Sequence, residues 1–258
     1  TKNEEEKIMD EAIGAKISDY LIKPVNPNQI LLSLKKILDH KSLIADKTVF
    51  NYQKQFREIS KSLIDLKNHE DWIEYFKKLL YWDLELESLE DLSMLEVFKT
   101  QMQEANIQFS KFIENNYENW MESNNGPTLS HQVFKKFVFP ELKSHKPCLL
   151  LMIDNLRYDQ WKTIMPEIKE YYKIESEKTY FSILPTATQY ARNSFFAGLT
   201  PLEISDRYPQ WWKNDTDGGG KNQHEFDFLK TQFERLGINR PLSYHKITQL
   251  IQSQQLIK

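Results

Sequence analysis

Long apolar runs are missing from this sequence, and cysteine and clustered histidine are almost absent. No apolar stretch approaches the roughly 18 residues of a membrane span, and the acidic start is unlike a signal peptide. The single cysteine, Cys148, excludes an internal disulfide and fits a reducing compartment. The six histidines show no His-x-x-x-His spacing. We therefore expect a cytoplasmic protein that has no membrane segment and no complete histidine-rich metal site.

The sequence also has no large excess of either positive or negative charge. Lys and Arg number 34 against 37 Asp and Glu, so the net charge of −3 gives no basic field to attract duplex nucleic acid. A hydrophobic content of 40% is that of a folded globular protein, and 258 residues are enough for one to two domains. The chain opens on Thr1 without a Met and stops at Lys258 soon after an expected helix begins. We expect a fragment with incomplete sites.

Hydrophobic periodicity divides the chain into three regions, residues 1–40, 41–145 and 146–258. The first and third mix expected helices and strands, whereas the middle region has only helical periodicity, with aromatic faces typical of a core. We therefore expect a multi-domain fold, α/β at both ends and all-α in the middle. The expected helices cover residues 4–14, 26–38, 47–68, 71–82, 84–120, 131–142, 159–171, 189–197, 224–236 and 244–255, and the expected strands cover 17–22, 148–153 and 172–181.

A six-residue apolar run, residues 148–153, ends at Asp154. It is too short for a helix and follows a proline, so we predict a buried strand in which Cys148 is an inert core thiol. In open α/β sheets, ligands bind beyond the carboxyl ends of the strands, so the pattern favours a metal or a phosphate near Asp154. Taken alone, the same pattern also fits a helix cap or a turn.

Thr188 precedes an expected helix, residues 189–197, that ends at Gly198. A hydroxyl at a helix start lies beside unpaired backbone N–H groups and the positive end of the helix dipole, and both favour a developing oxyanion. A neighbouring divalent metal activates such a hydroxyl as a nucleophile. The alternative is an ordinary N-cap. We predict that Asp154 and Thr188 lie close enough to share one divalent metal.

The order strand-Asp-Asn, then Pro-Thr-x-Thr-x-x-x-Arg before a helix that ends in Gly-Leu-x-Pro, resembles the alkaline phosphatase superfamily and specifically its PglZ branch. The resemblance implies that Asp154 is a metal ligand and Thr188 the metal-bound nucleophile of a Zn²⁺ site, with two ions in the full-length protein. Thr186 fits the pattern less well. Arg192 is a weaker candidate for binding substrate oxygens. The superfamily's further Asp and His ligands are expected beyond Lys258.

A second signature lies near the N-terminus and reads Gly14-Ala-x-x-x-Asp-Tyr-Leu-x-Lys23-Pro24. It resembles the last third of a flavodoxin-like, two-component receiver domain. The resemblance implies that Lys23 contacts a phosphorylated aspartate and that Thr1 senses it, with Mg²⁺ bound by residues that would precede Thr1. A cis X-Pro bond fixes the direction of the residue before it, so we predict a cis bond between Lys23 and Pro24. The alternative is a plain Lys-Pro turn.

A receiver end, a helical linker and a PglZ start, in that order, resemble the PglZ-containing response regulators of type IX secretion. The resemblance implies an intracellular regulator that forms a homodimer on phosphorylation, binds zinc and cleaves phosphodiester bonds in small nucleotides or oligonucleotides. It also implies a sensor histidine kinase and a sigma factor as partners. The alternative is a non-catalytic PglZ-fold module that signals through protein contacts made by residues 41–145. We expect the fragment to bind metal weakly and to hydrolyse nothing.

Residues 207–220 read as an irregular loop with two tryptophans and three consecutive glycines. No Lys-Ser/Thr follows the glycines, so we expect a flexible lid or surface loop and not a phosphate loop. Trp211 and Trp212 can stack a base or line the rim of the site. Ordinary packing is the alternative that we favour.

Overall fold

The computed structural model describes residues 26–89, 92–123, 125–143, 146–214, 216–249 and 252. These residues belong to two compact units. The first ends at Tyr117 and also takes in Arg157–Pro166, and the second comprises Glu118–Leu156 and continues from Glu167. Within the described ranges, no helix combines the length and the hydropathy that a bilayer crossing requires.

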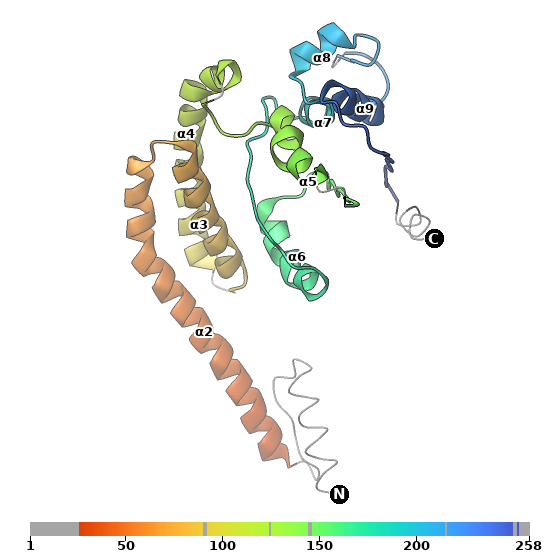
Figure 1. The fold of residues 1–258 in the computed structure, drawn as a ribbon. Coiled ribbons are helices and arrows are strands. Elements are labelled where there is room, and N and C mark those ends of the chain that lie inside the picture. The colour runs from red at the N-terminus through yellow and green to blue at the C-terminus, as the bar shows by residue number, and fades with distance from the viewer. Residues whose placement is uncertain are drawn as a thin grey trace, which may run out of the picture. The chain divides into compact units, whose positions relative to one another are not determined.

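Long helices make up the first unit (Figure 1). α2 (Pro27–Ser62) begins after Asn26, whose side chain accepts a hydrogen bond from the first turn while the Gln29 side chain accepts one from the Asn26 N–H. Such a capping box, with Pro at the first helical position, fixes where the helix starts. α3 (His69–Glu87) and the long α4 (Leu92–Glu122) follow.

The continuous α2 corrects the expected pair of helices over residues 26–38 and 47–68. The intervening residues 39–46 contain neither Gly nor Pro, so nothing in the sequence interrupts the helix. The same reason extends α3 to Glu87, past the break expected at Asp83.

Aromatic side chains fill the core of the first unit, as the periodicity of the middle region predicts. Tyr52 is fully buried and donates a hydrogen bond to Gln101 Oε1 at 3.0 Å, and Gln101 donates in turn to Ser60 Oγ at 2.8 Å. The buried cluster comprises Tyr52, Ile59, Leu63, Trp72, Tyr75, Leu79, Trp82, Leu86, Phe98 and Ala105. Tyr52, Gln101 and Ser60 are thus hydrogen-bonded to one another, which limits the free-energy cost of their burial, whereas Trp72 Nε1 and Tyr75 Oη have no hydrogen-bond partner in the described residues.

Short helices and a phenylalanine-rich core make up the second unit. Its helical elements are η2 (Ser130–Gln132), η3 (Phe134–Val138), α5 (Phe139–Leu142), α7 (Thr188–Ala197), α8 (Pro201–Arg207) and α9 (Glu225–Arg235). α7 and α9 lie side by side (Figure 1). Gln232 of α9 joins them, because its Nε2 donates to the backbone oxygens of Phe195 and Phe196 at 3.1 and 2.7 Å.

The expected helices in this part of the sequence are largely confirmed. α7 and α9 begin and end within one residue of the predicted bounds, and α6 (Tyr158–Tyr171) matches the expected helix over residues 159–171. α8 was not predicted, although Thr200, Pro201 and Glu203 form a capping box that marks its start. Residues 244–249, expected to begin a helix, are irregular.

The expected strands do not form in the described residues. Residues 148–153 are irregular and mostly exposed, with Leu149 at 84% and Leu151 at 72%, and Cys148 is exposed as well, whereas Met152 is partly buried against the core of the second unit. In residues 172–181, only Phe181 pairs, through an isolated parallel bridge to Leu129. A strand persists only where a neighbour satisfies its backbone groups, and no described segment pairs with residues 148–153. The predictions of a buried strand, of a core thiol and of an α/β third region are therefore not met by these residues.

Candidate functional site

The candidate site is built on the start of α7. Thr188 is the first residue of the helix and is exposed, whereas the second half of the helix is buried. The N-cap residue is Ala187, which makes no side-chain cap hydrogen bond. Gly198 ends the helix in the left-handed conformation, with φ at 61°. The chain therefore places a hydroxyl at an exposed helix start that has no side-chain cap.

Arg192 lies one turn after Thr188. Residues four apart share a helix face, so the hydroxyl and the guanidinium are neighbours on the surface of α7. Arg192 Nη1 donates to Asp154 Oδ2 at 2.9 Å, and Nη2 forms an ion pair with Glu225 Oε1 at 2.5 Å. The structure thus brings Asp154 to Arg192, which follows Thr188 by four positions on α7.

Asp154 reaches this position from a turn and not from a strand end. It follows the mostly exposed residues 148–153 and precedes Asn155, whose φ of 56° is left-handed. Asn tolerates that conformation better than most residues, which explains a sharp change of direction here. The Asp154 side chain is half-exposed, and its recorded partner is Arg192. Asp154 therefore lies in a turn, and its role as a metal ligand stays a prediction.

Glu225 is the residue of this site that the sequence analysis missed. It is the first residue of α9, only 1% exposed, and accepts a hydrogen bond from Tyr244 Oη at 2.5 Å. The same oxygen, Glu225 Oε2, also pairs with Lys246 Nζ at 3.1 Å. Burial, followed by the hydrogen bond to Glu225, raises the pKa of the Tyr244 hydroxyl, so Tyr244 stays a donor. Sequence alone offered only an acid in a first helical turn, which usually faces solvent.

Asparagine side chains hold the segment before α9 against α7. Asn222 Nδ2 donates to the backbone oxygen of Thr188 at 3.2 Å and to Asn193 Oδ1 at 3.1 Å. Asn193 is buried, and its own Nδ2 donates to the backbone oxygen of Lys221 at 3.2 Å. Lys246 Nζ donates to the backbone oxygen of Asn222 at 2.8 Å. Three segments are therefore tied together at the turn of α7 that carries Thr188.

A metal site is only partly represented in the described residues. Asp154 and Thr188 are oxygen donors of the kind that divalent metals accept, but catalytic zinc takes three protein ligands. No group of three or more His, Cys, Asp or Glu side chains that could hold a metal occurs in the described ranges. The sharing of one ion by Asp154 and Thr188 therefore stays a prediction.

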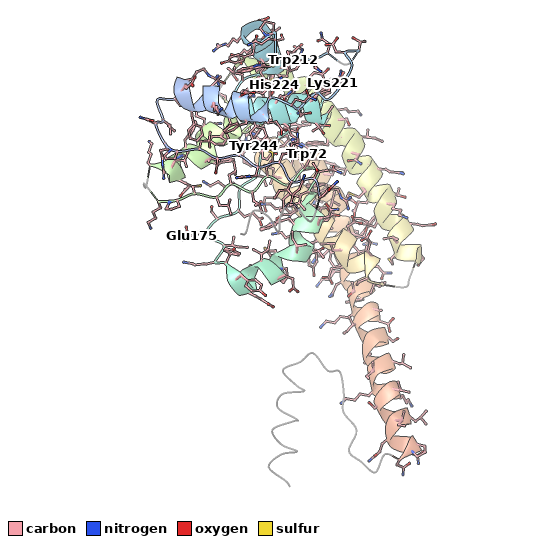
Figure 2. The ribbon with its side chains drawn as sticks, turned by 90° about the vertical axis from the view of Figure 1, so that its right-hand side faces the viewer. Trp72, Glu175, Trp212, Lys221, His224 and Tyr244 are labelled. Carbon is pink, nitrogen blue, oxygen red and sulfur yellow. The ribbon has the colours of Figure 1, made fainter. Side chains whose placement is uncertain are left out.

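The tryptophans of the loop before α9 are packed. Trp211 stacks on Tyr208 and on His224, with ring-centroid distances of 5.0 and 5.7 Å, and the ring centroids of Trp212 and Tyr190 are 5.8 Å apart. Trp212 and His224 are labelled in Figure 2. The favoured prediction of ordinary packing is confirmed for both.

The glycine-rich part of this loop is closed by lysines. Lys221 Nζ donates to the backbone oxygens of Asn214 and Asp217, and Lys213 Nζ donates to that of Gly218 at 3.0 Å. The loop is thus a surface turn whose backbone oxygens accept hydrogen bonds from its own lysines.

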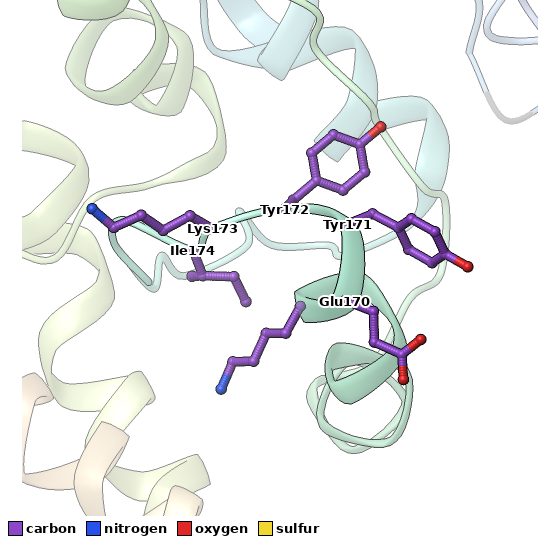
Figure 3. A pocket seen from close by; sticks show the side chains of 6 residues that line it. Glu170, Tyr171, Tyr172, Lys173 and Ile174 are labelled. Atoms are coloured by element: carbon purple, nitrogen blue, oxygen red, sulfur yellow. The ribbon is translucent and has the colours of Figure 1, made fainter. Parts of the chain in front are cut away.

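The hollow in Figure 3 lies away from the candidate site residues, at residues 169–174. It is an open hollow of about 550 Å³ at the C-terminal end of α6, lined by residues 169–174, including the exposed Tyr171 and Tyr172. None of the candidate site residues lines it. Thr1, Lys23 and the predicted cis bond to Pro24 lie outside the described residues.

Comparison with known protein families finds a match to a linker domain followed by a match to a PglZ domain. Residues 42–121 match the family described as the PorX response regulator linker domain. Residues 133–257 match the BREX system PglZ alkaline phosphatase-like domain, a range that contains Asp154, Thr188, Arg192 and Glu225. A search of curated proteins found no match.

The chain thus joins a response regulator linker to an alkaline phosphatase-like domain. It is a PorX-like protein with a PglZ domain. The linker indicates signalling partners in general, and the alkaline phosphatase-like domain indicates metal dependence in general.

Proposed function

We propose that this protein is a response regulator whose PglZ domain is a zinc-dependent phosphodiesterase or phosphatase for small nucleotides or oligonucleotides. In this proposal residues 1–40 end a receiver domain, residues 41–145 are a helical linker and residues 146–258 begin the output domain. The observation that carries the proposal is the pairing of Asp154 with Arg192, one helical turn from Thr188.

The three residues have separate roles in the proposed reaction. The Thr188 hydroxyl loses its proton to solvent and attacks phosphorus, the P–O bond to the leaving alcohol breaks, that alcohol takes up a proton from solvent, and water then hydrolyses the phosphothreonyl bond. The position of Thr188 at a helix start without a side-chain cap supports the negative charge that develops on its oxygen. The Arg192 guanidinium binds the non-bridging oxygens of the substrate, a task for which its planar fork is suited. Asp154 and Thr188 would each provide an oxygen ligand to the metal. Zinc, when bound, supplies positive charge that favours the deprotonated hydroxyl.

Regulation is assigned to the first unit. Lys23 and Thr1 form part of a phosphorylation switch with Mg²⁺ and a sensor histidine kinase, and the long helices of residues 41–145 carry receiver dimerisation to the PglZ domain. A sigma factor and control of type IX secretion complete the proposal. A phosphoryl mimic on the receiver should increase dimerisation of the full-length protein, measured by sedimentation. Unchanged dimerisation would contradict this role of the linker.

The test of the enzymatic proposal uses the full-length protein, a chromogenic phosphodiester and zinc. We expect turnover that a chelator removes and that zinc restores. Asp154→Asn should lower that turnover by more than about 100-fold, since loss of even outer-sphere partners of a metal costs 10- to 100-fold. Asp206→Asn, an exposed position on α8, is the matched control. Absence of zinc-dependent turnover in the wild-type protein would favour the non-catalytic signalling module instead.

A further inference from the structure

Arg192 sits between two carboxylates that differ sharply in exposure. The side chain of Glu225 is 1% exposed, whereas that of Asp154 is 50% exposed. A buried carboxylate cannot exchange its cation for water without a large cost in free energy. A half-exposed carboxylate exchanges partners easily, because solvent screens it. Glu225 is therefore the fixed partner of Arg192, and Asp154 the exchangeable one.

The surroundings of Glu225 keep it in place. Tyr244 and Lys246 come from the segment after α9, and both contact Glu225 Oε2, which leaves Oε1 to Arg192. Each oxygen thus has its own cation. The charges of Arg192 and Lys246 exceed that of Glu225 by one, so the group keeps a net positive charge once Asp154 is bound elsewhere.

We propose that Glu225, supported by Lys246, is a positioning residue that orients Arg192 so that its Nη1 is presented to a phosphoryl oxygen of the substrate. Nη1 donates to Asp154 in the present structure, and the phosphoryl oxygen takes that place. The inference rests on the proposed function and deepens it. It assigns to α9 and to the segment after it a part in phosphate recognition, at residues that neither family resemblance singled out.

Positioning and simple electrostatics predict opposite results for one substitution. Glu225→Gln keeps the shape of the side chain and an oxygen for Tyr244, but it removes a negative charge beside Arg192. If Glu225 acted only through its charge, the variant would bind phosphate more tightly. If Glu225 positions Arg192, the variant binds phosphate more weakly although the site has become more positive.

The experiment measures binding of inorganic phosphate to the 258-residue chain by calorimetry. Glu225→Gln should weaken binding about tenfold, the lower range for losing a charge-assisted hydrogen bond. Glu234→Gln, the same change at an exposed position of α9, is the matched control and should leave the affinity unchanged. Tighter binding in Glu225→Gln, or equal effects in the two variants, would overturn the proposal.

A double-mutant cycle separates positioning from general stability. In an Arg192→Met background, Glu225→Gln and Lys246→Met should have no further effect on phosphate affinity, because both act through Arg192. Lys246 is 43% exposed, so its variant keeps the test open if Glu225→Gln fails to fold. A persistent effect of Lys246→Met in that background would contradict the proposal, as would wild-type affinity in Arg192→Met.

The two proposals fail in different ways. Phosphate binding requires no turnover, so an inactive protein that binds phosphate through Arg192 would refute the proposed phosphodiesterase and leave the positioning role standing. An active protein whose KM and phosphate affinity are unchanged by Glu225→Gln would refute the positioning role alone.

Discussion

Arg192 donates to the Asp154 carboxylate at 2.9 Å, across 38 positions of sequence. The sequence singled out these two residues for different reasons, one as a metal ligand and the other as a contact to substrate oxygens. Their pairing means that the arginine is already neutralised on both of its terminal nitrogens, by Asp154 and by Glu225. A phosphate that binds Arg192 must therefore displace a carboxylate, and Asp154 is the one that solvent reaches.

The ion pair of Arg192 with Glu225 should contribute substantially to folding stability. Arg192→Met leaves the buried Glu225 with Lys246 as its remaining cation. We expect a loss of about 2–3 kcal/mol in the free energy of unfolding, below the 3–5 kcal/mol for breaking an isolated buried pair. The control is Arg207→Met. Arg207 Nη2 lies 3.8 Å from Glu203 Oε1, and both side chains are solvent-accessible, so this substitution should lower the free energy of unfolding by less than about 1 kcal/mol. Equal urea midpoints for the two variants would contradict this.

Gly198 should tolerate no side chain, for two separate reasons. Its φ of 61° is left-handed, and a Cβ there would lie 2.5 Å from Gln232 Oε1. Because Gln232 also ties α9 to α7, Gly198→Ala should cost about 3 kcal/mol, the sum of backbone strain and a disturbed buried amide. Gly237→Ala has a similar φ of 66° and no atom within 4 Å of the added Cβ, so it should cost only about 1–2 kcal/mol. Urea unfolding of both variants tests the difference.

Buried tyrosines should make the first unit sensitive to alkaline pH. Burial, more than the nearby Glu104, raises the pKa of Tyr75 from 10.0 to about 12, and burial raises that of Tyr52 as well. The unfolded chain therefore loses these protons first. The contribution of these protons to the free energy of unfolding is fully present below pH 10. It falls as the pH rises from about 10 toward 12, by up to about 1.4 kcal/mol per pH unit for each tyrosine.

Tyr75→Phe tests this dependence. The Tyr75 hydroxyl has no hydrogen-bond partner in the described residues, so its removal should cost little at pH 8 and should flatten the alkaline loss. Tyr81→Phe, at a side chain that is 54% exposed, is the control. Urea unfolding followed by circular dichroism at pH 8 and pH 11 gives both quantities. An unchanged difference between the two pH values in Tyr75→Phe would count against the assignment.

Local sequence signals were sufficient to predict the position of α7. Its start at Thr188, its end at Gly198 and its length follow from a short helical run between Pro185 and Gly198. Helix breaks were less predictable, because only Gly or Pro reliably interrupts a run, and α2 contains neither after Pro27 at its first position. The aromatic core of the middle region was also predictable, since helical spacing alone places such side chains on one face.

Contacts between residues far apart in the chain could not be predicted from the sequence. Residues 148–153 have the composition of a buried strand, but a strand depends on a partner that composition does not identify. Glu225 resembles an ordinary acid of a first helical turn, and only the packing of Tyr244 and Lys246 around it shows that it is buried and paired. The two carboxylates on Arg192 are likewise far from it in sequence, so the site could be placed on α7 but not completed.

The central claim is that Thr188 is the nucleophile of a phosphodiesterase, and two neighbouring threonines provide its most direct test. Thr188→Val removes the hydroxyl at nearly constant volume, and Thr186→Val does the same two residues earlier, where the side chain is also exposed. The measurement is kcat/KM for a chromogenic phosphodiester with zinc, in full-length variants whose helical content is unchanged. We predict a loss of more than about 10³-fold for Thr188→Val and near wild-type turnover for Thr186→Val. Wild-type turnover in Thr188→Val would contradict the account.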